Sequence, residues 1–284
     1  RNCDISLTYH KKENKIKCHY CGYSESLPGK CPQCQGTRIL MKGFGTEKVE
    51  EELAVIFPEA TIRRMDLDST RTRYAHQRII NDFEERRIQI LVGTQMVTKG
   101  LDFDNVSLVG ILNADNMLNF PDFRSHERSY QLMEQVSGRA GRKAKQGKVI
   151  IQSFNPSHPV IQHVVRHDYH AYFRSQLEDR NKFHYPPYSR LIILRLKHRD
   201  QSVLNKAALD LAQDLRADLG KRILGPEYPL VSRLQNWYIK QIMVKIERGQ
   251  NAAGYKELIR GKIDELLKIP AYRQVRVIVD VDPN

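Results

Sequence analysis

Between residues 38 and 165, short aliphatic runs alternate with amphipathic stretches. The aliphatic runs predict strands, and the stretches with apolar residues every three or four positions predict helices. Strands are expected at 38–42, 61–65, 88–93, 106–112 and 148–153, and helices at 46–57, 73–86 and 125–137. Strands that alternate with helices favour an α/β fold with a parallel sheet covered on both faces.

The pattern changes after residue 155. A long helix is expected over 160–180, ahead of Pro186-Pro187, which cannot continue a helix and marks a boundary. The elements expected beyond it are a strand at 190–196, a helix at 201–219, strand pieces at 223–224, 231–234 and 238–246, a helix at 252–268 and a strand at 275–281. This order predicts a small α+β sandwich.

Length and charge narrow the class of protein. The 284 residues suit two domains of ordinary size, and a chain that opens at Arg1 is expected to be a fragment of a longer protein. No apolar run approaches the ~18 residues that span a bilayer, and the sequence shows no charged-then-apolar leader ahead of a cleavage site, so we expect a soluble protein that is not secreted. The 46 Lys and Arg against 33 Asp and Glu, a formal charge of +13, favour a nucleic acid partner, although an ordinary basic protein is the alternative.

All five cysteines lie in the first 34 residues, a crowding that points to metal rather than disulfides. Cys18 and Cys21 form one CxxC turn, and Cys31 and Cys34 form a second. Zinc takes four tetrahedral thiolates, and each CxxC presents two of them from one tight loop. Small residues after each pair, Gly22 and Gly36, would let backbone amides approach the sulfurs. Unligated thiols and a redox CxxC are the alternatives.

Cys3 does not fit this four-cysteine site. It is either a spare thiol or the remainder of a further CxxC turn cut away upstream. His10, His19 or Asp4 could also replace a cysteine as ligand, although lone histidines near a metal are usually bystanders. The cysteines define a zinc-binding segment over residues 1–37, truncated at its start, ahead of domains over 38–187 and 188–284.

Two segments suggest nucleotide chemistry. In the first, residues 93–103, Gly93-Thr94 ends an apolar run and opens a turn whose amides can face phosphates. In the second, residues 135–142, Arg139 and Arg142 are three positions apart, so a helix would place both guanidinium groups on one face, suited to a triphosphate. Each segment alone has an ordinary reading, as a common strand end or a solvated helix face, but together on one α/β lobe they are far more specific.

These segments resemble motifs V and VI of superfamily 2 helicases. The phrases at 43–47 (GFGTE), 64–70 (RMDLDST), 121–124 (PDFR) and 280–283 (DVDP) narrow the resemblance to the primosomal replication-restart DNA helicases. The similarity covers essentially the whole chain and is strongest over 18–153. It implies a RecA-like second helicase lobe with a zinc-binding insertion, followed by an α+β C-terminal domain. It also implies an ATP-dependent 3′→5′ DNA helicase that recognises stalled or branched forks and restarts replication by primosome assembly.

The resemblance assigns roles to individual positions. Arg142 and Arg139 match the arginines of motif VI, with Arg142 as the arginine finger, and Gln135 matches the start of that motif. Motif V contacts the DNA backbone and couples it to the nucleotide, and the positions that fall in it are Gly93, Thr94, Lys99, Gly100 and Asp102. No single chemical role can be given to the phrase at 43–47 beyond a turn and a helix cap.

The chain departs from the family pattern in two ways. The family has eight cysteines in two interleaved zinc sites, of which this chain has five: Cys3, Cys18 and Cys21 would share one zinc, whereas Cys31 and Cys34 would need upstream ligands. This set conflicts with the four-cysteine site. The sequence also contains neither a GxxxxGK[ST] loop nor an Asp-Glu-x-His, so ATP with Mg²⁺ should be bound mainly by a missing first lobe, and this fragment should be inactive alone.

In the C-terminal region, aromatic and basic residues that could stack on single-stranded DNA are Arg233, Trp237, Tyr238 and Lys240. A core Trp at a strand start is the alternative. The resemblance further implies the single-stranded DNA-binding protein and other primosome proteins as partners, in the bacterial cytoplasm at the nucleoid. Two other functions stay open: a non-catalytic zinc-ribbon DNA-binding protein, and a different superfamily 2 DNA translocase.

Overall fold

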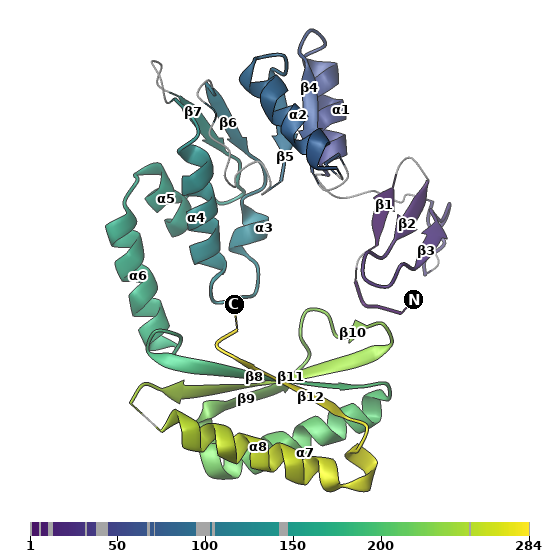
Figure 1. Cartoon of the computed structure of the whole chain (residues 1–284), viewed down its shortest axis with the longest axis vertical. Coiled ribbons are helices and arrows are strands. Elements are labelled where there is room, and N and C mark those ends of the chain that lie inside the picture. The colour runs from purple at the N-terminus through teal and green to yellow at the C-terminus, as the bar shows by residue number, and fades with distance from the viewer. Residues whose placement is uncertain are drawn as a thin grey trace. The chain divides into compact units, whose positions relative to one another are not determined.

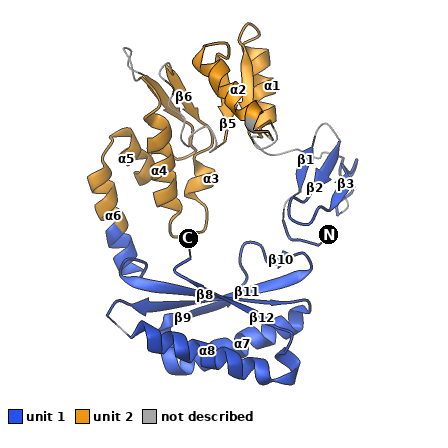
Figure 2. Ribbon diagram, in the orientation of Figure 1, with its two compact units in different colours: residues 1–39, 177–284 blue, residues 40–176 orange. Residues whose placement is uncertain are grey.

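The computed structural model describes residues 2–5, 7–10, 14–31, 33–37, 45–66, 69–70, 72–94, 103, 106–141, 147–249 and 251–283. The chain forms two compact units, one of residues 1–39 with 177–284 and the other of residues 40–176 (Figure 2). Among the described residues, no helix combines the length and the apolar character that crossing a membrane requires.

The first half of the 40–176 unit pairs two strands with two helices. Strand β4 (Ile62–Met65) runs parallel to β5 (Ile90–Gly93), and helices α1 (Thr46–Ile56) and α2 (Arg73–Glu84) pack on them (Figure 1). Met65, Ile80 and Phe103 form the buried centre of this half. The predicted strand at 38–42 lies outside the described residues.

The second half repeats the parallel pairing. Strand β6 (Leu108–Ile111) runs parallel to β7 (Lys148–Ile151). The helices of this half are α3 (Asp115–Leu118), α4 (Ser125–Ser137), α5 (Pro159–Val165) and α6 (Tyr169–Lys182). Tyr130 of α4 stacks on Tyr172 of α6, with ring centroids 4.0 Å apart and planes 4° from parallel, inside a core that also holds Met133. Two parallel strand pairs with packed helices confirm the α/β class of this lobe.

The single long helix predicted over 160–180 is wrong. The structure has two helices here, because α5 ends at Val165 and α6 begins at Tyr169. His167 in the connecting turn has φ of +52°, a left-handed conformation that cannot continue an α-helix. No glycine or proline occupies this turn, so no residue in it predicts a helix break.

The C-terminal region is an antiparallel sheet with its two helices on one face (Figure 1). The strand order is β10-β11-β8-β12, and β9 also pairs with β11. The elements are β8 (Ser189–His198), α7 (Gln201–Leu219), η3 (Gly220–Arg222), β9 (Ile223–Glu227), β10 (Arg233–Leu234), β11 (Trp237–Glu247), α8 (Ala252–Lys268), η4 (Pro270–Tyr272) and β12 (Arg276–Val281). This arrangement confirms the predicted α+β domain.

Helix α7 shows why this domain folds as it does. Asp200 caps the helix by accepting hydrogen bonds from the amides of Ser202 and Val203, which satisfies two of the donors left free at a helix start. Its apolar stripe, which includes Leu204, Leu211 and Leu215, is fully buried against the sheet. Gly220 ends the helix with φ of +59°.

The cysteine-rich segment forms a small antiparallel sheet of β1 (Thr8–His10), β2 (Lys15–Lys17) and β3 (Ser24–Ser26). This segment, called the ribbon below, was predicted as a domain of its own. In the structure it belongs to the same compact unit as the C-terminal region, although the more than 130 residues of the 40–176 unit lie between them in the sequence (Figure 2).

Candidate functional site

The two CxxC turns have the same backbone geometry. The amide of Gly22 donates to the carbonyl of Cys18 at 3.0 Å, and the amide of Gln35 donates to the carbonyl of Cys31 at 2.9 Å. Gly22 and Gln35 also share a left-handed backbone, with φ of +73° and +57°. Equivalent hydrogen bonds and equivalent φ values give both segments the backbone geometry of a zinc knuckle, the tight loop that presents two sulfurs to one metal.

The two glycines differ in position and role. Gly22 occupies the left-handed position of its knuckle, but the matching position in the second knuckle is Gln35, not Gly36. A Cβ added to Gly36 would lie 3.4 Å from the Cys34 sulfur, so this glycine leaves room beside a thiol instead of forming the turn.

Three thiols meet at one point. The sulfurs of Cys3, Cys18 and Cys21 lie within 4.8 Å of one another, and Cys3 and Cys18 are only 5% and 3% exposed. Zn–S bonds of about 2.3 Å place tetrahedral sulfurs just under 4 Å apart, so this cluster fits three of four zinc ligands. Within the described part of the chain it is the single group of three or more such ligands, and Cys31 and Cys34 are not in it. The structure thus presents the set implied by the family resemblance rather than the four-cysteine set.

Backbone amides lower the pKa values of two knuckle thiols. The amides of Cys21 and Tyr20 lower the pKa of the Cys18 thiol, and amides in the second knuckle lower that of Cys31 in the same way. Burial instead raises the pKa of Cys3. A metal takes the thiolate form, so lower pKa values favour ligation at neutral pH.

The three residues considered as substitute ligands lie outside the thiol cluster. His10 and His19 face each other edge to plane, with ring centroids 5.1 Å apart. Asp4 pairs instead with the guanidinium group of Arg233 at 3.3 Å.

The first of the two segments predicted for nucleotide chemistry, residues 93–103, begins where the sequence predicts. Gly93 is the last residue of β5, and Gly93 and Thr94 are exposed at its carboxyl end. The other predicted coupling residues, Lys99, Gly100 and Asp102, lie outside the described residues.

The second of these segments, residues 135–142, does not continue as the predicted helix. Gln135 is exposed near the end of α4, but the helix ends at Ser137, and Arg139 lies half-buried in the following turn. Helical spacing therefore does not extend to Arg139, because the turn at Gly138 ends the 3.6-residue period. Arg142 lies outside the described residues.

The phrases at 43–47 and 64–70 come together. The Thr46 hydroxyl donates to Asp66 Oδ2 at 2.5 Å, and the Arg64 guanidinium lies 3.2 Å from Asp66 and 3.9 Å from Glu47. Burial raises the pKa of Asp66, but Thr46, the Ser69 amide and Arg64 together outweigh it and hold the pKa below its usual value. The first phrase, which had no assigned role, thus binds the start of α1 to the loop after β4.

The predicted C-terminal residues cluster around the β10–β11 hairpin. Trp237 is partly exposed, and the guanidinium groups of Arg199 and Arg276 lie 5.4 and 4.3 Å from its ring. Arg233 lies 5.7 Å from the ring of Tyr238. The alternative of a core tryptophan is wrong, since Trp237 is not buried.

The remaining predicted position there also lies beside an aromatic ring, with Lys240 4.6 Å from the ring of Tyr228. Sequence reasoning missed Tyr228, Arg199 and Arg276: the two arginines lie 38 and 39 positions from Trp237, and Tyr228 lies 12 positions before Lys240. No local motif could reveal them, because only sheet pairing brings them together.

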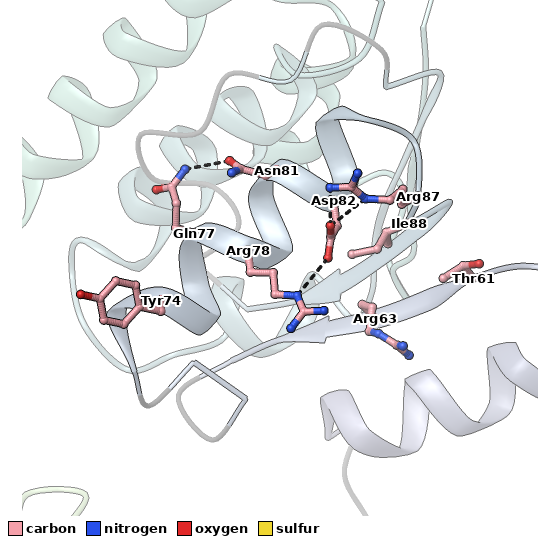
Figure 3. Close-up of a pocket in the computed structure, with 9 residues that line it drawn as sticks. All are labelled: Thr61, Arg63, Tyr74, Gln77, Arg78, Asn81, Asp82, Arg87 and Ile88. Carbon is pink, nitrogen blue, oxygen red and sulfur yellow. Dashed lines mark hydrogen bonds and ion pairs between the residues drawn. The ribbon is translucent and has the colours of Figure 1, made fainter.

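A pocket of about 620 Å³ lies on the motor lobe beside α2 (Figure 3). Two of its three arginines share one carboxylate, since Asp82 lies 2.7 Å from Arg87 and 3.8 Å from Arg78. Its lining residues are Thr61, Arg63, Tyr74, Gln77, Arg78, Asn81, Asp82, Arg87 and Ile88, and none of them is a predicted motor residue.

Comparison with known families assigns a class to each part of the chain. Residues 32–144 match the helicase conserved C-terminal domain, and residues 1–25 match the Cys-rich region domain of a DNA helicase. Residues 181–284 match the primosomal protein N C-terminal domain. The fold, the thiol cluster and these matches together define a helicase-type protein with a cysteine-rich ribbon and a primosomal C-terminal domain.

The particular family follows from its relatives. The chain is 39% identical to the replication restart protein PriA of Bacillus subtilis over 99% of its own length and 35% of that relative. It is 39% identical to that of Synechocystis and 37% identical to that of Treponema pallidum, over 99% of this chain and 34% and 42% of theirs. The chain belongs to the PriA family, and it spans about a third to two-fifths of the relatives it matches.

Proposed function

We propose that this chain is part of an ATP-dependent 3′→5′ DNA helicase that recognises stalled or branched replication forks and restarts replication by primosome assembly. The observation that carries this proposal is the combination in one chain of a helicase C-terminal domain, a PriA-type cysteine-rich region and a primosomal C-terminal domain. A helicase lobe alone would fit many superfamily 2 translocases. Its two flanking domains favour replication restart.

In this proposal the lobe contributes half of a nucleotide site. Arg142 acts as an arginine finger on the transferring phosphoryl group, assisted by Arg139 and Gln135, and such a finger contributes about 10³-fold or more in rate. The segment that begins at Gly93 and Thr94 couples DNA to the nucleotide. The printed sequence has no GxxxxGK[ST] loop, so a partner lobe would bind the phosphates and Mg²⁺, and these 284 residues alone would not hydrolyse ATP.

The C-terminal domain contributes a DNA surface. Successive strand residues face opposite sides of a sheet. Leu194 and Leu196 of β8 pack into the helix-covered core, so Arg195 and Lys197 face the helix-free side, where Arg276 pairs with Lys197 in register. Basic residues beside the partly exposed Trp237 ring suit a single strand, whose bases stack on aromatic rings and whose phosphates pair with cations.

The ribbon contributes a metal site. Cys3, Cys18 and Cys21 would hold a zinc ion as thiolates, and zinc there would act structurally by fixing the ribbon. Cys31 and Cys34 have the knuckle geometry for a second ion, with further ligands from elsewhere. The proposed protein partners are the single-stranded DNA-binding protein and other primosome proteins, in the bacterial cytoplasm at the nucleoid.

The test is the DNA-stimulated ATPase of the full-length parent protein, wild type against Arg142→Ala. We expect a fall of several hundredfold while forked DNA still binds. Arg78→Ala is the matched control. The Arg78 side chain is 85% exposed and its ion pair with Asp82 is long, at 3.8 Å, so this substitution should leave the ATPase rate unchanged. Equal activity of Arg142→Ala and wild type, or a parent without ATPase, would instead support a non-catalytic DNA-binding zinc-ribbon protein.

A further inference from the structure

A hairpin turn of the C-terminal sheet binds the ribbon. Strands β10 and β11 pair Leu234 with Trp237, so Gln235 and Asn236 form a two-residue loop, and their φ values of +49° and +63° are those of a type I′ turn. In such a turn the amides of the two loop residues are not used by the hairpin. Here both of them point at the ribbon.

Each loop amide has a defined acceptor. The amide of Gln235 donates to the sulfur of Cys3 at 3.2 Å, and the amide of Asn236 donates to the carbonyl of Asn2 at 2.8 Å. The side-chain amide of Gln235 donates to the carbonyl of Tyr20, inside the first knuckle, at 2.9 Å. The hairpin therefore contacts both chain segments that carry the three clustered thiols.

Asp4, in the ribbon next to Cys3, also contacts the C-terminal sheet. The amide of Asp4 donates to the carbonyl of Arg233 at 2.9 Å. Its side chain accepts from the hydroxyl of Ser232 at 2.8 Å and lies 3.3 Å from the Arg233 guanidinium. These contacts join residues about 230 positions apart, and they hold the backbone on both sides of Cys3.

The sulfur of Cys3 depends on this turn for its amide donor. Cys18 receives amide donors from its own knuckle, whereas the amide donor of Cys3 is Gln235, 232 residues away in the sequence. A metal-bound thiolate in a buried site needs such donors to disperse its charge, and these outer partners tune metal affinity. Cys3 is 5% exposed, so water cannot easily replace the amide.

We propose that the 234–237 hairpin is the outer shell of the Cys3–Cys18–Cys21 metal site, with Gln235 as its positioning residue. Metal binding at the thiols then fixes the ribbon to the C-terminal sheet, next to Trp237 at the start of β11. On ligation each thiol releases its proton to solvent, and the Gln235 amide stabilises the Cys3 thiolate that remains. This inference rests on the zinc site proposed above.

The experiment uses the ¹⁵N-labelled 284-residue chain loaded with ¹¹³Cd²⁺. The ¹¹³Cd resonance reports thiolate ligation, and a through-hydrogen-bond coupling between ¹¹³Cd and the Gln235 amide proton reports the N–H···S contact. We expect a thiolate-bound ¹¹³Cd resonance, a correlation to that proton, and amide exchange at Gln235 at least tenfold slower than in the metal-free chain. The amide of Val244, inside β11, should exchange equally in both forms.

Two variants separate the alternatives. Gln235→Gly keeps the amide and tolerates positive φ, so it should retain the correlation although it loses the contact to Tyr20. Cys3→Ser should abolish the correlation and return Gln235 to metal-free exchange while the sheet stays folded. A thiolate-bound ¹¹³Cd without coupling to Gln235, and with unchanged exchange there, would overturn this inference and leave the zinc site standing. Failure to bind ¹¹³Cd through thiolates would overturn both.

Discussion

The hydrogen bond between Thr46 and Asp66 offers a direct test of how the motor lobe is held together. Replacing Thr46 with valine removes the hydroxyl and keeps the β-branched shape. The 2.5 Å bond to a carboxylate is charge-assisted, and such bonds contribute about 1.5–3 kcal/mol. Asp66 keeps Arg64 and the Ser69 amide as partners after the change, so we expect a cost near the lower end, about 1.5 kcal/mol.

The assay must report on the motor lobe, because the single tryptophan, Trp237, lies in the other unit. Hydrogen–deuterium exchange of peptides from α1 and β4 satisfies this need. A cost of about 1.4 kcal/mol is a tenfold change in an equilibrium, so protection in both elements should fall about tenfold in Thr46→Val. Thr46→Ser keeps the hydroxyl and should exchange like wild type.

Two further measurements check the assigned cause. In an Asp66→Asn background, Thr46→Val should cost much less, since the two residues act through one bond. The pKa of Asp66 is lowered in the folded protein, so its contribution is present above the unfolded value near 4 and is lost as the pH falls through the folded value. The difference between Thr46→Val and wild type should therefore shrink in acid. Protection within twofold of wild type at pH 7 would refute the role of this bond.

Three other predictions follow from the structure. Leu211→Ala should destabilise the C-terminal domain by about 3–5 kcal/mol in urea unfolding followed by Trp237 emission, because Leu211 is 0% exposed, whereas the same change at the half-exposed Leu209 should cost little. Asp115→Asn should lower the melting temperature at pH 7, and by progressively less as the pH falls below the unfolded value near 4, because the Phe154 amide lowers the pKa of Asp115; a loss that does not change with pH would contradict this cause. Trp237→Ala should weaken binding of labelled oligo(dT), measured by anisotropy, by about 1–3 kcal/mol per lost base stack, and unchanged affinity would remove this ring from the DNA surface.

The sequence could predict the elements whose signals are local. The bounds of α4, α7 and α8 agree with the predicted 125–137, 201–219 and 252–268, because each combines an apolar stripe with a clear end. The break at His167 was missed because no residue there announces a left-handed turn. The spacing of apolar residues therefore predicts where a helix forms more reliably than it predicts a helix break that contains no glycine or proline.

The metal cluster required information beyond spacing. Spacing alone favoured the two CxxC pairs as one site, whereas the structure joins Cys3 to Cys18 and Cys21. The family resemblance had implied this set, because it carries the pattern of eight cysteines that a chain with five cannot show. The contact with Gln235 had no sequence signal at all, since the turn lacks the usual Asn-Gly pair and its partner lies 232 residues away.

That separation has a consequence for the order of synthesis. Cys3 leaves the ribosome 232 residues before Gln235, and at bacterial elongation rates of about 5–20 residues per second the delay is roughly 12–46 s. During this interval the thiols of the nascent ribbon have no hairpin to shield them, and oxidation or a wrong metal could capture them. Correct metal loading of the thiols therefore depends on how fast the metal binds relative to translation, because the ribbon lacks the hairpin while residues 40–176 are synthesised.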